Sequence, residues 1–209
     1  MNIFLTDYDL NVVAQHHCDV HLRKMIVELA QMLSTAHCVL DNKVVAYKKT
    51  HANHPSAAWV RETKVNYEYA FRLLSCMCIE YEYRFDKPIK TAMHLKALST
   101  PPKNITKQHL TKFALAMPEQ FFHENPTVAY RRFMRNKLLG WKRGKKVMIN
   151  YTRRKPPTFL QYLYEDVPVP TGIHTKRRLA INTTVRKVST DRHVLHSTSR
   201  QSVRLQKGA

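Results

Sequence analysis

The stretch that decides the fold is "HHCDVHLRKMIVELAQMLSTAH", residues 16–37. Asp19 is a residue type that favours the start of a helix, and after it apolar side chains recur every three or four positions. This spacing predicts a helix from Asp19 to about Leu40, with one apolar face. The apolar face consists of Leu22, Met25, Ile26, Leu29, Met32, Leu33 and Ala36. Such a face has to be buried against other elements, so the stretch predicts a helical core.

A polar stripe runs along the other side of the same helix. It consists of His21, Lys24, Glu28, Gln31 and Thr35. A mixed polar stripe usually lies in solvent. Here, however, one carboxylate, one amine and one imidazole come within reach of each other, and these groups serve proton transfer and covalent catalysis. The stripe is therefore either a solvated face or the wall of a catalytic site.

Helical spacing and capping residues predict further helices on both sides of this stretch. We expect a short helix capped by Asp7 or Asp9 and ending near Gln15, one long helix over Ser56–Phe85, a short helix over Thr91–Leu98, and a basic helix from Thr127 to about Lys142 behind Pro126. Residues 107–122 read as helix or loop, interrupted by Pro118. After Gly144 the periodicity is weak. The expected fold is all-α: a compact helical domain built around two long helices (residues 1–144), followed by an extended or partly disordered basic arm (residues 145–209).

The composition places the chain among soluble intracellular proteins. Of its 209 residues 44% are hydrophobic, enough for a core, and only 4 are glycine, which argues against a Rossmann-type design. No run of about 18 apolar residues predicts a membrane span. The N-terminus lacks the basic region of a signal peptide, and the cysteines at positions 18, 38, 76 and 78 show no CxxC spacing. We expect a cytoplasmic protein (host cytoplasm or nucleoid if a phage encodes it) with reduced thiols and no membrane partner.

Charge is unevenly distributed along the chain. The net charge is +20, from 35 basic and 15 acidic residues. Residues 131–209 carry 20 basic and 3 acidic residues, net +17, which leaves +3 for residues 1–130. A nearly neutral body with a strongly basic extension indicates a polyanionic partner, most simply nucleic acid and in particular double-stranded DNA.

The candidate nucleic-acid contacts begin in the basic helix, where aromatic and basic residues alternate in "AYRRFMRNKLLGWKRGKK" (residues 129–146). Basic groups neutralise phosphates and aromatic faces stack on exposed bases. The aromatic residues also have nearly helical spacing, so some of them could instead face the core. The candidates are Arg131, Arg132, Arg135, Lys137, Trp141, Lys142, Arg143, Lys145 and Lys146, joined by Arg153, Arg154 and Lys155.

A metal site is an alternative interpretation of the histidines. Cys18 and His21 are three positions apart, and so are His51 and His54 in "HANH". These four residues could bind zinc as a structural or catalytic site. The spacing departs from that of zinc fingers and no CxxC anchors it, so a metal-free protein is the preferred expectation.

Three segments carry a resemblance to known families. Residues Asp19, His21, Leu22, Glu28 and Leu29 resemble the N-terminal helix of the phage pyrimidine-dimer DNA glycosylases, and residues 53–85 are similar to the second segment of that family. The chain also resembles an uncharacterised phage family through "HCDVHLRKM" (17–25), "THANHP" (50–55) and "AMP" (116–118). This second resemblance covers about residues 1–145.

The resemblance implies an activity. The glycosylase family is compact, all-helical and free of cofactors; it moves a base out of the DNA stack, and an amine attacks C1′ of the sugar with help from a glutamate. Glu28 is the matched acid and His21 the matched helix histidine. His54 leads the loop before the second segment and completes the candidate catalytic set of Glu28, Lys24, His21 and His54.

The chain departs from the family at the nucleophile. The family uses the α-amine of a small residue exposed after removal of methionine, whereas the second residue here is Asn2, whose bulk should retain Met1. The amine is then that of Met1 or of Lys24. The arginines that flank the family's glutamate are replaced by Val27 and Gln31, so the fold could persist with altered chemistry, for instance on modified bases.

Two function classes follow. The leading one is a phage DNA-binding protein that processes bases, resembling a pyrimidine-dimer DNA glycosylase and abasic-site lyase. The other is a non-catalytic basic nucleic-acid-binding protein, such as a phage accessory, virion or ribonucleoprotein component; a zinc-stabilised binding module is its metal-bound variant.

Overall fold

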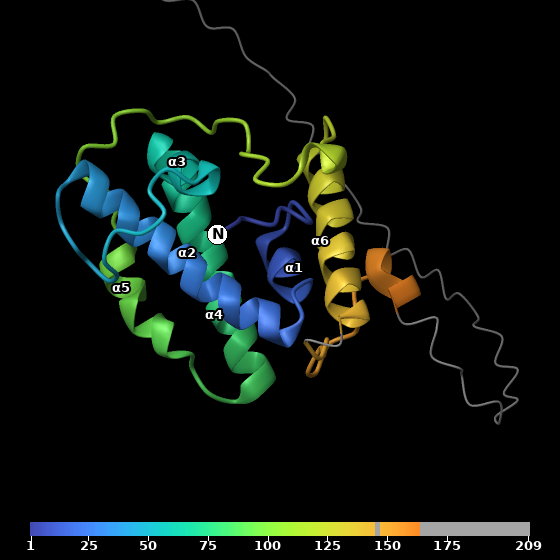
Figure 1. Cartoon of the computed structure of the whole chain (residues 1–209). Helices are drawn as coiled ribbons and strands as arrows, with labels where there is room; N and C mark the ends of the chain where they lie inside the picture. The colour runs from blue at the N-terminus through green and yellow to red at the C-terminus, as the bar shows by residue number, and fades with distance from the viewer. Residues whose placement is uncertain (145–146, 164–209) are drawn as a thin grey trace, which may run out of the picture. The chain divides into compact units, whose positions relative to one another are not determined.

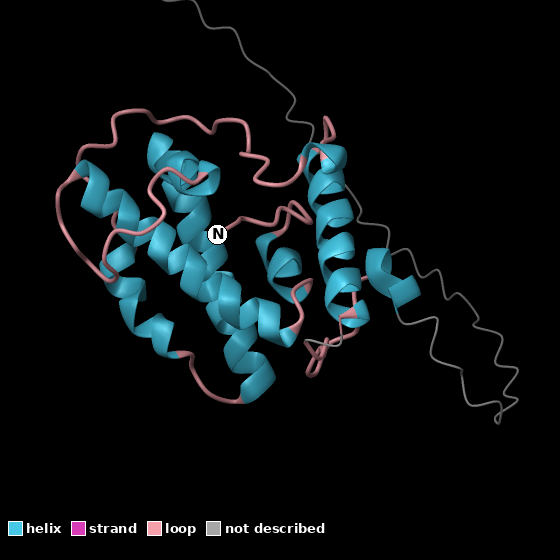
Figure 2. Cartoon of the chain, in the orientation of Figure 1, coloured by secondary structure: helices cyan, strands magenta, loops and turns pink. Residues whose placement is uncertain are grey.

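The computed structural model describes residues 1–144 and 147–163, which form helices and loops with no β-strand among them (Figures 1 and 2). The α-helices are α1 (Leu10–Gln15), α2 (Asp19–Leu40), α3 (Pro55–Glu62), α4 (Lys64–Phe85), α5 (Leu95–Leu98) and α6 (Pro126–Arg143). Short 3₁₀ helices are η1 (Lys90–His94), η2 (Glu119–Phe121) and η3 (Thr158–Leu163). The all-α prediction is confirmed for this part of the chain. Most of the expected arm, residues 164–209, and Lys145 and Lys146 lie outside the described residues.

The core forms where α2 and α4 pack along each other, with α1 and α3 against them (Figure 1). From α2, Leu22, Ile26 and Leu33 are completely buried, and Leu74 and Met77 of α4 are buried with them. Each such side chain contributes about 1.5–3 kcal/mol by leaving water. The apolar face predicted from the sequence is therefore the centre of the molecule's core.

The prediction of one continuous helix over Ser56–Phe85 is wrong, because the helix is interrupted at Thr63. Thr63 is extended (φ −142°, ψ 158°) and separates α3 from α4. Its hydroxyl accepts a hydrogen bond from the backbone N–H of Asn66 at 3.1 Å and so caps α4. The Asn66 side chain donates to the carbonyl of Trp59 at 2.9 Å, which satisfies the end of α3. Both helices bury an apolar face, so the hydrophobic pattern continues across the break.

The other predicted helices are present with small changes. Asp9 caps α1 through the N–H of Asn11, and Pro126 is at the first position of α6 behind an Asn125 cap. Residues 91–98 form η1 followed by α5, and residues 107–118 are loop rather than helix. At α2 the N-cap is Cys18, whereas Asp19 is the first helical residue and makes no cap.

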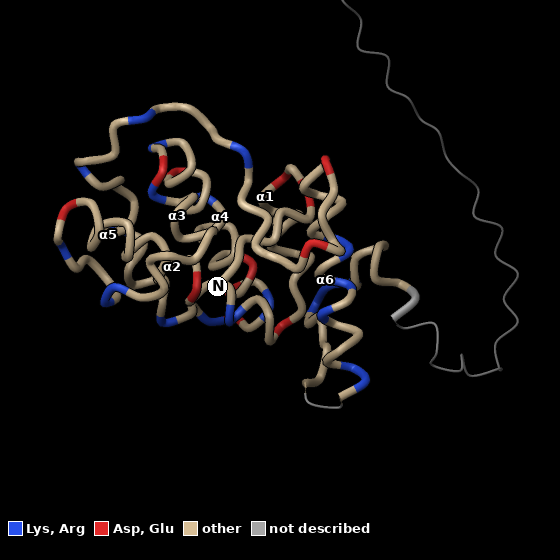
Figure 3. Tube along the Cα trace, turned by 45° about the horizontal axis from the view of Figure 1, so that its top comes forward, with Lys and Arg blue, Asp and Glu red and all other residues tan. Residues whose placement is uncertain are grey.

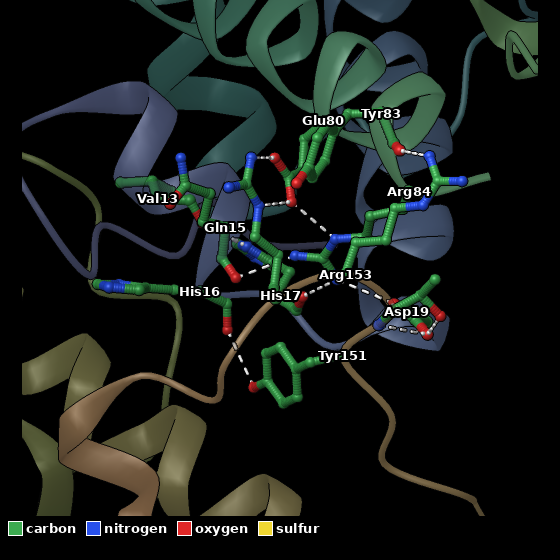
Figure 4. Close-up of polar contacts among 12 residues, drawn as sticks. Val13, Gln15, His16, His17, Asp19, Glu80, Tyr83, Arg84, Tyr151 and Arg153 are labelled. Atoms are coloured by element: carbon green, nitrogen blue, oxygen red, sulfur yellow. Dashed lines mark hydrogen bonds and ion pairs between the residues drawn. The ribbon is translucent and has the colours of Figure 1, made fainter. Parts of the chain in front are cut away.

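Asp19 instead belongs to a buried ionic network (Figure 4). The fully buried Arg84 donates to the Glu80 carboxylate at 2.7 Å and to Asp19 at 3.0 Å. It also donates to the backbone carbonyls of His17 and Gln15, at 2.8 and 3.0 Å. This guanidinium thus ties α4 to the turn between α1 and α2, in the paired form that a buried charge requires.

The same network holds the first part of the expected arm against the body. The backbone N–H and the hydroxyl of Thr152 donate to Asp19, and Tyr151 donates from its hydroxyl to the carbonyl of His16 at 3.2 Å. Farther on, Leu160 is completely buried. The described residues 147–163 therefore pack with the helices.

No helix in the described part of the chain is long and apolar enough to cross a membrane. Cys18, Cys38, Cys76 and Cys78 are free thiols.

Candidate active site

The N-terminal segment is built into the fold between α2 and α6 (Figure 1). Phe4 is buried, stacks on Phe133 of α6 at a centroid distance of 5.6 Å, and meets the edge of His21 of α2 at 4.7 Å. Asn2 donates from its side-chain amide to the carbonyl of Ala116 at 2.7 Å and accepts from the hydroxyl of Tyr130 at 3.1 Å. These contacts fix the position of the first residue.

The fixed terminus lies in a small pocket. The Met1 side chain is only 2% exposed, although the whole residue is partly exposed, so its accessible part is main chain. The pocket has a volume of about 190 Å³. It is lined by Met1, Asn2, Phe4, His21, Lys24, Met25, Glu28, Ala116, Phe133 and Lys137.

Glu28 lies between two amines in this pocket. Its Oε2 is 3.5 Å from the α-amine of Met1, and its Oε1 is 3.8 Å from Nζ of Lys24. The Glu28 side chain is 15% exposed and that of Lys24 56% exposed. The stripe predicted on this helix is therefore not a solvated face at Glu28, and the carboxylate is within proton-transfer range of an amine once a substrate draws them together.

His54 is within electrostatic reach of the same groups. Partial burial lowers its pKa first, the positive Met1 amine lowers it further, and the Glu28 carboxylate raises it. Its Nδ1 accepts a hydrogen bond from the backbone N–H of Ser56 at 3.2 Å, which caps α3 and leaves the ring proton on Nε2. His54 therefore lies near enough to Glu28 and Met1 for their charges to act on it, but it does not line the pocket that holds them.

His21 lines the pocket but is almost completely buried. It is 1% exposed, neither ring nitrogen has a hydrogen-bond partner, and it meets the rings of Phe4 and Trp141 edge-on. Burial, together with the charges of His17 and Lys137, lowers its pKa well below the ordinary value. His21 is therefore a neutral side chain that supports Phe4 and cannot supply a proton near neutral pH.

Helix α6 contributes to the pocket and carries a series of basic residues (Figure 3). Lys137 is half-buried, and burial and then the charge of Lys24 lower its pKa, while Glu28 raises it. Its Nζ lies 5.2 Å from the ring centre of Trp141, a cation–π contact. Trp141 itself packs against the buried His21, so its ring is part of the protein's packing rather than a surface on which a base could stack.

The remaining candidate nucleic-acid contacts divide into two groups. Arg132, Arg135, Lys142, Arg143 and Lys155 are exposed. Arg131 pairs with Asp7 at 3.0 Å, Arg154 with Glu80 at 2.8 Å, and Arg153 forms an ion pair with Asp86. The charges of Arg131, Arg153 and Arg154 are thus partly neutralised by carboxylates of the protein itself.

The alternative zinc set is not assembled. In residues 1–144 and 147–163, no three His, Cys, Asp or Glu side chains lie close enough together to hold a metal ion. Cys18 is buried, and this burial raises the pKa of its thiol. His51 instead makes a 2.6 Å contact with the hydroxyl of Thr50.

Sequence reasoning did not find the residues that hold Met1 in place. Both polar atoms of the Asn2 side chain are used to fix the terminus. The apolar run that follows it, Ile3–Leu5, was the available signal, since a buried start of the chain also restrains the amine.

Compared with known proteins, the chain matches no family model, no curated protein and no solved structure.

Proposed function

We propose that this protein is a DNA base-processing enzyme of the glycosylase and abasic-site lyase type, in which the Met1 α-amine is the nucleophile and Glu28 the proton carrier. The observation that supports it is the 3.5 Å separation of these two groups in one pocket, where the Met1 side chain is buried and its main chain is partly exposed. A fixed terminal amine beside a half-buried carboxylate is an arrangement suited to imine chemistry.

The steps balance with the groups present. The neutral amine forms a bond to C1′ of the deoxyribose, the C1′–N bond to the base breaks, and the base departs with the electron pair and takes up a proton from water. Glu28 accepts the proton that the amine loses and returns it to O4′ as the sugar ring opens to an imine. Removal of a proton from C2′ then expels the 3′ phosphate, and water hydrolyses the imine to restore the amine.

Met1 is favoured over Lys24 as the nucleophile. Lys24 is 56% exposed, whereas the Met1 amine is held by a buried segment. Well-oriented reactants gain much of their rate from such positioning.

The size of the pocket favours a substrate with one ring. A cavity of about 150 Å³ is known to accept a single benzene ring. The pocket of about 190 Å³ is of that order, which suits one extruded sugar or base better than two cross-linked pyrimidines.

Two of the segments behind the family resemblance line this pocket: His21 and Lys24 come from "HCDVHLRKM", and Ala116 comes from "AMP". His54 of "THANHP" is not among the lining residues and is related to Met1 and Glu28 by electrostatic interaction. Two segments far apart in the chain thus contribute to one pocket, which supports a shared function for them.

Borohydride trapping tests the proposal. Wild-type protein is incubated with duplex DNA that carries an abasic site or ultraviolet-induced dimers, and borohydride reduces any imine to a stable adduct. We expect an adduct with abasic DNA, and a loss of turnover of about 10²–10⁴-fold in Glu28→Gln. Tight DNA binding without an adduct or strand cleavage on either substrate would contradict the proposal and favour the second function.

That second function is non-catalytic nucleic-acid binding. It is favoured by the 20 basic residues in residues 131–209, many more than a small glycosylase site requires. In that case Glu28→Gln leaves all DNA-dependent properties unchanged.

A further inference from the structure

A second, larger hollow lies at the other end of α2. It has a volume of about 910 Å³ and is lined by the end of α2, the loop after it, and the segment of η1, α5 and the following loop. Its residues are His37, Asp41, Lys43, Val45, Met93, Lys96, Ala97, Thr100, Pro101, Lys103 and Asn104. We call this hollow the lysine groove. Its size falls in the range of small-molecule sites, about 300–1,000 Å³.

The segments around the lysine groove concentrate positive charge. Residues 41–50 and 87–104 contain seven lysines and one acid, net +6. Residues 1–130 as a whole have a net charge of only +3, so the rest of that region is net −3. The basic positions around α5 are visible in Figure 3. The general basicity of the chain therefore does not account for this cluster.

The acid in the groove lining is already engaged. Asp41 accepts hydrogen bonds from the backbone N–H groups of Lys103 and Asn104, at 2.8 and 3.1 Å. It also lies 3.9 Å from Nδ1 of His37. These bonds join the two sides of the groove and leave the Lys43, Lys96 and Lys103 ammonium groups as its charged surface.

The groove also has an apolar part. Met93 is 78% exposed, and Val45, Ala97 and Pro101 line the hollow beside it. Hydrogen bonds connect the helices beneath the groove. The Tyr67 hydroxyl of α4 donates to the carbonyl of Leu98 in α5 and contacts Nε2 of His37 in α2, both at 2.9 Å. An exposed methionine in a firm, cationic hollow suits a ligand that has both a flat apolar part and an anionic part.

We infer that the lysine groove binds nucleoside phosphates, with the phosphate among Lys43, Lys96 and Lys103 and the base against Met93 and Pro101. The ligand is either a free nucleotide or a nucleotide of a single strand. The groove begins at His37 of α2, nine residues beyond Glu28. At a rise of 1.5 Å per residue, these two positions are about 14 Å apart along the helix axis. The groove is therefore separate from the pocket lined by Met1 and Glu28, which we call the amine pocket, and it does not depend on the proposed catalysis.

The test compares two triple variants of the full chain with equal charge. Lys43→Gln/Lys96→Gln/Lys103→Gln removes the groove lysines, and Lys64→Gln/Lys107→Gln/Lys112→Gln removes three exposed lysines elsewhere. Calorimetric titration with thymidine 5′-monophosphate should show at least tenfold weaker binding for the groove variant and less than twofold for the control. Titration with a labelled oligothymidylate distinguishes the source, because a strand ligand binds more tightly than the mononucleotide with the same dependence on the groove lysines.

A single variant tests recognition of the base. Met93→Ser should weaken thymidine monophosphate binding several-fold and leave inorganic pyrophosphate binding unchanged. Equal effects of the two triple variants would overturn the inference. So would a glutamate-rich peptide that binds as tightly as the nucleotide and depends on the same lysines, since the groove would then be a docking surface for acidic protein.

Discussion

At the scale of single residues, Glu28 differs from an ordinary helix glutamate because it lies beside the α-amine of Met1. Its i,i+4 partner Lys24 makes an ion pair of the kind that contributes little at a surface. The Met1 amine comes from a segment that folding places against α2 and α6, so its position is part of the tertiary structure. This is the feature on which the proposed chemistry depends.

The buried histidines predict how stability depends on pH. Burial lowers the pKa of His16 to about 4 and that of His17 to about 3, and also lowers that of His21. The folded state therefore keeps them neutral, while the unfolded chain takes up protons below its ordinary pKa of about 6.5. Their contribution is complete above that pH and is lost as the pH falls, by up to about 1.4 kcal/mol per pH unit for each histidine.

Urea unfolding between pH 7 and pH 5 measures this slope. His17→Leu should reduce it by about one histidine's share, and His109→Leu, at an exposed position, controls for loss of an imidazole at the surface. A free energy of unfolding that stays constant over this range would show that these histidines are not held neutral.

At the scale of elements, Arg84 is the main polar connection in the described part of the chain. It joins α4 to the start of α2, and through Asp19 and Glu80 to residues 150–154 (Figure 4). Removal of one partner from such a network leaves a buried charge uncompensated, which costs more than the net contribution of the intact pair.

We predict that Arg84→Gln lowers the free energy of unfolding by about 3–5 kcal/mol, because the buried residue Asp19 then has a carboxylate without its cation. Chemical denaturation measures the change. Arg72→Gln, at an exposed position on the same helix, should change stability by no more than about 0.5 kcal/mol. A loss below 1 kcal/mol in Arg84→Gln would mean that the network is not a main source of stability.

The sequence predicted the elements better than their connections. The limits of α2 and the Pro126 start of α6 follow from local spacing and capping, which are properties of neighbouring residues. The interruption at Thr63 depends on a hydrogen bond from the Asn66 side chain to the end of α3. Asp19 binds Arg84, 65 positions away, instead of capping its own helix. For the candidate site, the residue types of the polar stripe single out Glu28, and the family resemblance adds His54. The contacts of Asn2 with Ala116 and Tyr130 span 114 and 128 positions and leave no local pattern.

At the scale of the whole molecule, positive charge gathers in two places within the described part of the chain: along α6 beside the amine pocket, and around the lysine groove (Figure 3). If these residues bind phosphates as proposed, counterions are released, and the affinity for DNA then depends on salt with a slope set by the number of phosphates neutralised.

Duplex binding by the full chain should therefore weaken steeply with salt, by about 0.9 in log K per unit of log salt for each phosphate contacted. Arg132→Gln on α6 should make the slope shallower by about 0.9, and Lys107→Gln, in a loop away from α6, should leave it unchanged. Fluorescence anisotropy at several salt concentrations measures both. A flat dependence would reject nucleic acid as the partner.

The most direct test of the central claim is to locate the covalent bond. After borohydride reduction on abasic duplex DNA, proteolysis and mass spectrometry identify the peptide that carries the sugar. We predict that the modification lies on the α-amine of Met1 and disappears when two residues are added before Met1. An adduct on Lys24 or Lys137 that persists with the added residues, or no adduct at all, would contradict it.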